Sequence, residues 1–173
     1  MTTLNFMRAG PQSAAPPMEQ PQPDVVMEED EIIRRADKIL AERFYRQTEL
    51  TSAASTKEFL RGKLRNELNE VFAVLFLDNR HRVIEYREMF RGTIDGCSVH
   101  PRPIAQAALL INAAAVIFAH NHPSGVASHS MADEHITTRL KSALELIDVR
   151  VLDHVIVGGG GLDMMSFAER GLI

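Results

Sequence analysis

An apolar segment that ends in two histidines constrains the fold of this chain more than any other feature. Residues 113–119 are apolar and become β-prone towards their end, which predicts a buried strand. Residues i and i+2 of a strand point to the same side. His120 and His122, which follow this run, should therefore leave the end of the strand with their ring nitrogens directed at one point.

Asp133 is a candidate for a third ligand of a metal ion held by these two imidazoles, because it lies eleven residues beyond His122, across a loop. Catalytic zinc usually takes three protein ligands from His, Asp, Glu or Cys and leaves the fourth position to water. Two nearby histidines also occur by chance, and Ser130 with Asp133 has a plainer interpretation as the N-cap and first turn of a helix. The two interpretations are compatible, because a helix that begins there would direct both side chains back towards the histidines.

The sequence H-N-H-P-S-G at residues 120–125, followed by S-x-x-D at residues 130–133, resembles the JAMM motif of the JAB/MPN metallopeptidases. The wider sequence is similar to the RadC-like bacterial branch of that family, over about residues 56–173. It looks most like the short RadC-like proteins, which lack the helix-hairpin-helix segment of full-length RadC. The further motifs that carry the likeness are F-R-G-T at 90–93, V-H-P-R at 99–102, L-D-H-V-I-V-G at 152–158 and S-F-A-E-R-G-L at 166–172.

The resemblance implies a ligand set and a fold. His120, His122 and Asp133 would hold one Zn²⁺ per chain, in a JAB/MPN fold related to the cytidine-deaminase-like architecture. His154 falls in a family motif outside the metal signature and is interpreted as structural or as a side chain behind the ligands. The chain departs from the family at Val126, where an acidic residue is common, and at His129, where a proline is common.

The resemblance also supplies a general acid/base from upstream of the first strand, in a pattern like E-x-x-G-x-L. Glu70 matches this pattern, with Ala73 in place of the glycine, and Glu67 is the second choice. Without the family, Glu70 would read as an ordinary solvated residue at the start of a strand. Ser130 would stabilise the negatively charged tetrahedral intermediate. The implied activity is a metallopeptidase or isopeptidase that acts on a protein or peptide.

The hydrophobic pattern predicts an α/β fold in which helices flank a mixed sheet. Three segments are expected: a disordered Pro/Gln-rich tail at 1–27, a helix and linker at 28–53, and the metallopeptidase domain at 54–173. Within the last segment, strands are predicted near 71–77, 83–90, 149–157 and 163–167. Helices are predicted from about 55, at 101–112 and at 130–146.

Composition limits the classes of function and the compartment. At 173 residues and 45% hydrophobic, the chain can bury one sizeable core. Its net charge of −4 argues against a surface that binds nucleic acid. The single cysteine, Cys97, excludes an internal disulfide and suits a reducing compartment. No apolar run is long enough for a membrane span and no secretion signal is evident, so we expect a cytoplasmic protein.

Two other functions compete with the zinc hydrolase. One is a RadC-like protein associated with DNA repair and without peptidase activity, which the acidic balance of the chain disfavours. The other is a non-catalytic MPN scaffold, which the complete set of expected ligands disfavours. A zinc nucleobase deaminase is excluded, because it needs a P-C-x-x-C pair of thiolates and this chain has one cysteine. The sequence leaves the substrate and the oligomeric state open.

Overall fold

A computed structural model describes residues 31–39, 52–94, 96–161 and 163–173. Residues 31–39 are helical, which agrees with the helix expected there, while the Pro/Gln-rich segment lies outside the described residues. The remaining elements are helices α2 (Ala53–Leu64), α3 (Pro101–Ile111) and α4 (Met131–Glu145), the short 3-10 helix η1 (Gly159–Gly161), and strands β1 (Val71–Leu77), β2 (Val83–Arg91), β3 (Ala115–Asn121), β4 (Arg150–Val157) and β5 (Met164–Ser166).

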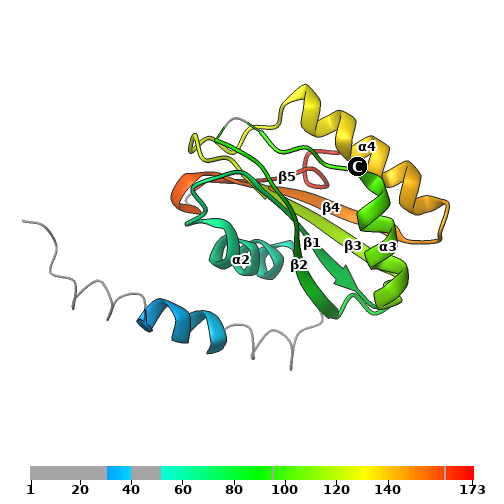
Figure 1. Ribbon diagram of the computed structural model, residues 1–173, viewed down its shortest axis with the longest axis horizontal. Coiled ribbons are helices and arrows are strands. Elements are labelled where there is room, and N and C mark those ends of the chain that lie inside the picture. The colour runs from blue at the N-terminus through cyan, green and yellow to red at the C-terminus, as the bar shows by residue number, and fades with distance from the viewer. Residues whose placement is uncertain (1–30, 40–51, 95, 162) are drawn as a thin grey trace, which may run out of the picture. The chain divides into compact units, whose positions relative to one another are not determined.

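The five strands form one sheet in the order β2-β1-β3-β4-β5 (Figure 1). β1 pairs antiparallel with both β2 and β3, β3 pairs parallel with β4, and β4 pairs antiparallel with β5. Such a mixture of pairings confirms the predicted α/β fold with a mixed sheet. All seven residues of β1 and of β3 are buried, as expected for central strands that are covered on both faces.

Helices cover the two faces of the sheet, and alternate residues of each strand serve one face or the other (Figure 1). On one face, Leu60 and Leu64 of α2 pack with Leu75 of β1 and Ile117 of β3. On the other face, α3 and α4 pack over Phe72, Val74, Phe76, Val116 and Phe118. Because successive side chains of a strand point to opposite faces, the continuous apolar runs that predicted β1 and β3 supply both cores.

Three chain segments meet at one end of the sheet, where the central strand β3 finishes. β3 ends there with His120 and Asn121, β1 begins there because it runs antiparallel to β3, and α4 begins near the same end. Phe72 is paired with His120. Continuing this register by two residues places Glu70 across from His122, on the face that is covered by α3 and α4.

Two smaller results concern the first helix of the domain and the membrane. α2 begins at Ala53, close to the start predicted near residue 55, and its N-cap is Ser52, whose side chain accepts a hydrogen bond from the Ser55 N–H. Among the helices in the described ranges, none combines the length and the apolar character that crossing a membrane would require.

Candidate metal centre

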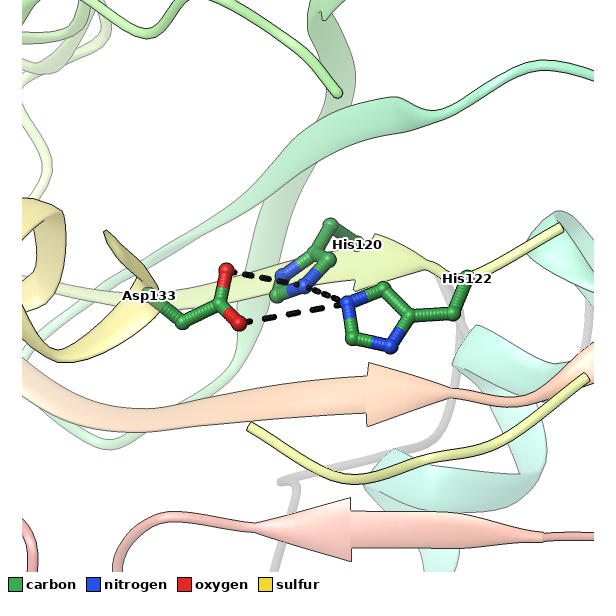
Figure 2. A group of neighbouring side chains, drawn as sticks. All are labelled: His120, His122 and Asp133. Carbon is green, nitrogen blue, oxygen red and sulfur yellow. Dashed lines mark hydrogen bonds and ion pairs between the residues drawn. The ribbon is translucent and has the colours of Figure 1, made fainter. Parts of the chain in front are cut away.

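Three side chains converge at the end of β3, and they are the three that the sequence proposed as ligands (Figure 2). The Nε2 atoms of His120 and His122 are 2.9 Å apart. His120 Nε2 is 3.3 Å from Asp133 Oδ1, and His122 Nε2 is 3.9 Å from Asp133 Oδ2. Two ligands bound tetrahedrally to one zinc ion at ordinary zinc–nitrogen distances lie about 3.3 Å apart. The three measured separations therefore bracket the spacing that zinc requires.

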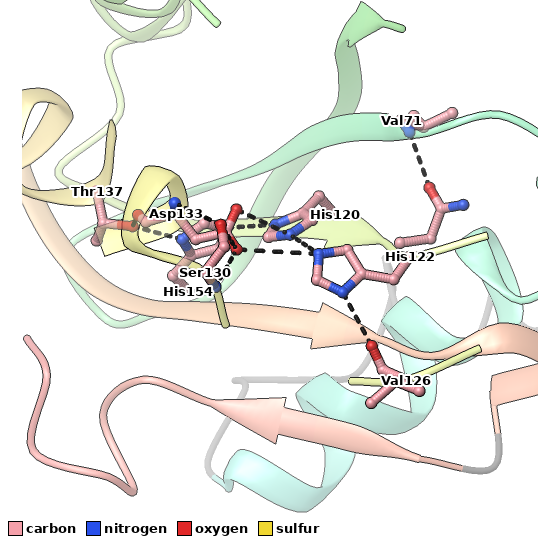
Figure 3. Close-up of polar contacts among 9 residues, drawn as sticks. Val71, His120, His122, Val126, Ser130, Asp133, Thr137 and His154 are labelled. Atoms are coloured by element: carbon pink, nitrogen blue, oxygen red, sulfur yellow. Dashed lines mark hydrogen bonds and ion pairs between the residues drawn. The ribbon is translucent and has the colours of Figure 1, made fainter. Parts of the chain in front are cut away.

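The backbone carbonyl of Val126 orients the imidazole of His122. His122 Nδ1 is 2.9 Å from this oxygen (Figure 3). Because a carbonyl oxygen only accepts hydrogen bonds, Nδ1 must carry a proton and donate it. In the neutral ring, Nε2 then has a free lone pair, which faces the position between the three side chains.

His120 is held from behind by side chains instead. Its Nδ1 is 2.8 Å from Nε2 of His154, and Nδ1 of His154 is 2.6 Å from the hydroxyl oxygen of Thr137. The Thr137 hydroxyl in turn donates to the backbone carbonyl of Asp133, at 2.5 Å. Figure 3 shows this chain of contacts running from α4 through β4 to the end of β3. Ligating histidines commonly make such a contact through the nitrogen that does not bind the metal.

Burial keeps the two inner histidines neutral. It lowers the pKa of His120 to about 4, although the Asp133 carboxylate acts in the opposite direction and His122 adds to the lowering. Burial, reinforced by His120 and His122, also holds the pKa of His154 well below its usual value. Lone pairs of two imidazoles and a carboxylate thus meet at one point, which needs a cation. A metal ion fits this donor set.

The helix cap places the carboxylate, so the capping interpretation of Ser130 and Asp133 is confirmed and is compatible with the position of Asp133 beside the two histidines. Ser130 is the N-cap of α4 and its hydroxyl oxygen accepts from the Asp133 N–H, while Asp133 accepts from the Ser130 N–H in a reciprocal capping box. The Ser130 hydroxyl donates its proton to Asp133 Oδ2, at 2.7 Å. It must therefore turn away from Asp133 before it can donate to anything else.

A cleft of about 490 Å³ opens over the three candidate ligands. Its lining includes Glu70 and Ser130, as well as the apolar side chains of Ile94, Val99 and Ile136. Partial burial raises the pKa of Glu70 above its usual value, opposed by His122 and assisted by Asp133. Glu70 thus lies within electrostatic reach of both of these side chains.

Glu67, the second choice for the acid/base, has a different environment. Its carboxylate forms an ion pair with Arg91, at 2.9 Å, and Arg91 also binds Glu88. Glu67 lines a second groove of about 350 Å³ beside residues 158–160, which shares His122 and Pro123 with the cleft. The geometry therefore favours Glu70 over Glu67 as the carboxylate that faces the candidate metal position.

Asn121, which lies between the two histidines, faces the opposite side of the strand and fixes the start of β1. Its Oδ1 accepts from the Val71 N–H at 2.8 Å, and its Nδ2 donates to the carbonyls of Glu67 and Asn69 at 3.2 and 3.0 Å. These three contacts hold the backbone on both sides of Glu70. The residue between the candidate ligands thus sets where the candidate acid/base lies.

Sequence reasoning missed part of this site. The sequence gives no role to Thr137, and it indicates for His154 only a structural place or one behind the candidate ligands. A signal for His154 is present, because the three residues after it, 155–157, are apolar and predict a buried position, where a histidine rarely lacks a polar partner. His129, at a position where the family often has proline, pairs with Glu134 at 2.8 Å and packs its ring against Phe167.

Comparison with known proteins gives a consistent result over most of the chain. The family model described as a RadC-like JAB domain matches residues 50–172. A UPF0758 protein from Thioalkalivibrio sulfidiphilus is 56% identical over 142 residues, which are 82% of this chain and 62% of that protein. A UPF0758 protein from Vibrio cholerae is 54% identical over 143 residues, which are 83% of this chain and 89% of that protein. For a UPF0758 protein from Nitrosococcus oceani, the identity is 62% over 124 residues, which are 72% of this chain and 54% of the relative. The matched region thus spans less than two thirds of the first and third of these relatives.

Proposed function

This chain belongs to the RadC-like JAB domain family, and from that premise and the geometry of its His120, His122 and Asp133 cluster we propose that it is a zinc-dependent hydrolase of amide bonds in proteins or peptides. The observation that carries the proposal is the convergence of two imidazole Nε2 atoms and one carboxylate beside a cleft that also holds Glu70. A bound zinc ion would polarise the substrate carbonyl and lower the pKa of a water molecule from 15.7 to about 7.

Glu70 is proposed as the general acid/base. Its carboxylate would take a proton from the attacking water and pass it to the nitrogen of the leaving amine, a role that contributes roughly 10²–10⁴-fold to such rates. A pKa raised above that of an ordinary glutamate supports the role, because proton transfer in both directions is easiest when the pKa of the group approaches the working pH. The Asn121 contacts support it further, since they keep the segment that carries Glu70 against β3.

Ser130 is proposed to donate a hydrogen bond to the oxygen on which negative charge develops. Its hydroxyl rests on Asp133 Oδ2, and rotation about one side-chain bond would turn it towards the cleft that it lines. The capping role does not prevent this, because the Asp133 N–H donates to the lone pair of the Ser130 oxygen and leaves the hydroxyl proton free to move.

The lining of the cleft supports a peptide as the substrate class. Besides the polar groups of the site, the cleft is lined by Ile94, Val99 and Ile136, which offer apolar contact for a side chain beside the scissile bond. The net charge of −4 gives no support to a nucleic-acid substrate. A protein or peptide is therefore the partner we propose.

The test combines metal analysis with turnover. Purified protein should hold close to one zinc per chain and cleave members of a panel of peptide and isopeptide-linked substrates, and a chelator should abolish this activity. Glu70→Gln should retain the zinc and lose about 10²–10⁴-fold in kcat. Glu67→Gln is the matched control and should keep its activity, because Glu67 is bound to Arg91.

Several outcomes would contradict the proposal. A loss of activity in Glu67→Gln but not in Glu70→Gln would move the acid/base to Glu67. Iron in place of zinc would argue against hydrolysis, because two histidines and one carboxylate with open positions also form the iron site of oxygenases. Protein that takes up no metal after reconstitution would favour a non-catalytic scaffold.

A further inference from the structure

Two buried side chains, those of Thr137 and His154, connect the backbone of one candidate ligand to the ring of another. The connection runs from the Asp133 carbonyl to Thr137, from Thr137 to His154, and from His154 to Nδ1 of His120, with separations of 2.5, 2.6 and 2.8 Å. Thr137, His154 and His120 are all buried, so that water does not compete for these contacts. Asp133 stands at both ends, because its carboxylate also faces Nε2 of His120.

Hydrogen-bond chemistry gives this connection a direction. The Asp133 carbonyl only accepts, and the Thr137 hydroxyl has a single proton, which the 2.5 Å contact commits to that carbonyl. The Thr137 oxygen must then accept from Nδ1–H of His154, whose neutral ring leaves Nε2 without a proton. Nε2 of His154 therefore accepts from Nδ1–H of His120, and the neutral His120 ring has its lone pair on Nε2.

We propose that Thr137 and His154 are positioning residues that hold His120 in this tautomer before any metal arrives, so that its Nε2 lone pair already faces the metal position. The inference rests on the proposed metal site but not on the proposed hydrolysis. It explains why His120 needs two further side chains behind it. A histidine partner can donate as well as accept, and His154 alone would leave the direction undecided until Thr137 fixes it.

We call the hydrogen-bonded series Asp133 carbonyl, Thr137, His154 and His120 the relay. The opposite set of proton positions shows what the relay prevents. If the Thr137 proton were directed at His154, the Thr137 oxygen would face the Asp133 carbonyl at 2.5 Å with no proton between them. His154 would then donate from Nε2, and His120 would carry its own proton on Nε2. That proton would occupy the place of the metal, which would have to displace it and reverse the whole chain in order to bind.

The first experiment reads the tautomers directly in the unsubstituted protein. ¹⁵N NMR of the metal-free, histidine-labelled chain at neutral pH distinguishes a protonated Nδ1 from a protonated Nε2. We expect both His120 and His154 to carry the proton on Nδ1. Protonated Nε2 in His154 would overturn the proposal, and this measurement does not depend on any variant folding.

The second experiment removes the hydroxyl that gives the relay its direction. Thr137→Val keeps the shape of the side chain but leaves Nδ1 of His154 facing a methyl group, so Nδ1–H of His154 loses its acceptor. We expect zinc affinity, measured by competition with a chelator, to fall by about 10–100-fold. The same variant should shift the His154 tautomer towards Nε2–H in the NMR spectrum.

Two matched variants separate this effect from general damage to the core. Thr137→Ser, made in the parent protein, keeps the hydroxyl. Its zinc affinity should stay within about threefold of the parent, a much smaller change than the loss of about 10–100-fold expected for Thr137→Val. Thr138→Val makes the same change at the next residue of α4, which is exposed, and should have no effect. Equal zinc affinity in Thr137→Val and Thr138→Val would overturn the proposal. Protein with the expected tautomers and tight zinc but without hydrolysis would leave the relay intact and contradict the proposed function alone.

Discussion

His120 and His122 are two residues apart on one strand and point at the same position, yet their surroundings differ. The His120 side chain is 1% exposed and rests on the imidazole of His154. The His122 side chain is 19% exposed and rests on the backbone carbonyl of Val126. One candidate ligand is thus buried in the core beneath α4, and the other is partly exposed and bonded to the backbone of a loop.

The difference shows two ways to fix the proton of a ligating histidine. A carbonyl oxygen can only accept, so one contact to Val126 settles the tautomer of His122. A side chain such as His154 can reverse its role, so the tautomer of His120 depends on a longer chain that ends at a carbonyl. Substitutions of side chains should therefore affect the support of His120 far more than that of His122.

Removing the ligands themselves should produce the largest effects. His120→Ala and His122→Ala should each reduce bound zinc from about one per chain to nearly none, because each removes one of the three proposed protein ligands. Stability of the metal-free forms should separate them. His120→Ala opens a cavity in the core and strands Nε2 of His154, which should lower the free energy of unfolding by about 3 kcal/mol.

His122→Ala should lower the free energy of unfolding by about 1 kcal/mol or less, because the side chain is partly exposed at a loop. Urea denaturation in the presence of a chelator gives both values, and metal analysis of the same samples gives the stoichiometry. Equal losses of stability in the two variants would contradict the distinction between a core ligand and a loop ligand.

Acidification should act mainly through the core histidine. Burial lowers the pKa of His120 to about 4, whereas an unfolded histidine titrates near 6.5. Between these two values the unfolded chain binds more protons than the folded chain, so stability falls as the pH decreases through this window. From pH 7 to pH 5, metal-free protein should lose about 2 kcal/mol of unfolding free energy through His120 alone.

His154 should add to the loss, because burial lowers its pKa as well. Urea denaturation at pH 7, 6 and 5 in the presence of a chelator measures the slope, and this range lies above the ordinary titration of carboxylates. The His120→Asn variant is the control and should show a shallower slope. A free energy of unfolding that is flat over this range would mean that His120 is not neutral and buried in the folded chain.

The parts of this site that were predictable from the sequence follow from local rules. Alternation along a strand predicted that His120 and His122 share a face, and a helix cap predicted that Asp133 follows the loop. The hydrophobic pattern predicted the central strands, because both are buried on two faces. Each of these predictions depends on residues no more than a few positions apart.

The remainder depends on register between distant segments, which no local pattern contains. His154 meets His120 because β3 and β4 pair in parallel with Phe118 beside His154, a contact across 34 residues. Thr137 joins them only because α4 crosses this part of the sheet. The position of Glu70 was available only through the family resemblance, since its place across from His122 follows from the pairing of β1 with β3.

The smallest changes in zinc affinity are expected from substitutions in the loop that supports His122. They test most directly whether His120 and His122 are held in different ways. Val126 contacts His122 through its carbonyl, while the residue as a whole is 58% exposed. Val126→Ala keeps the carbonyl and should change zinc affinity by less than about twofold, as is usual for exposed positions away from such contacts. Only a change in the backbone should disturb this ligand.

Gly125→Ala provides that change, because Gly125 has a φ of +95°, which is unfavourable for alanine, and its own N–H donates to the His122 carbonyl. The strain should move the Val126 carbonyl and weaken zinc binding by about three- to tenfold, below the loss expected for a disrupted contact behind His120. Chelator competition on both variants and the parent measures the difference. If Val126→Ala weakened zinc as much as Thr137→Val, the support of His122 would depend on a side chain after all. The two ligands would then be held in the same way, and a backbone carbonyl would not be the more robust partner.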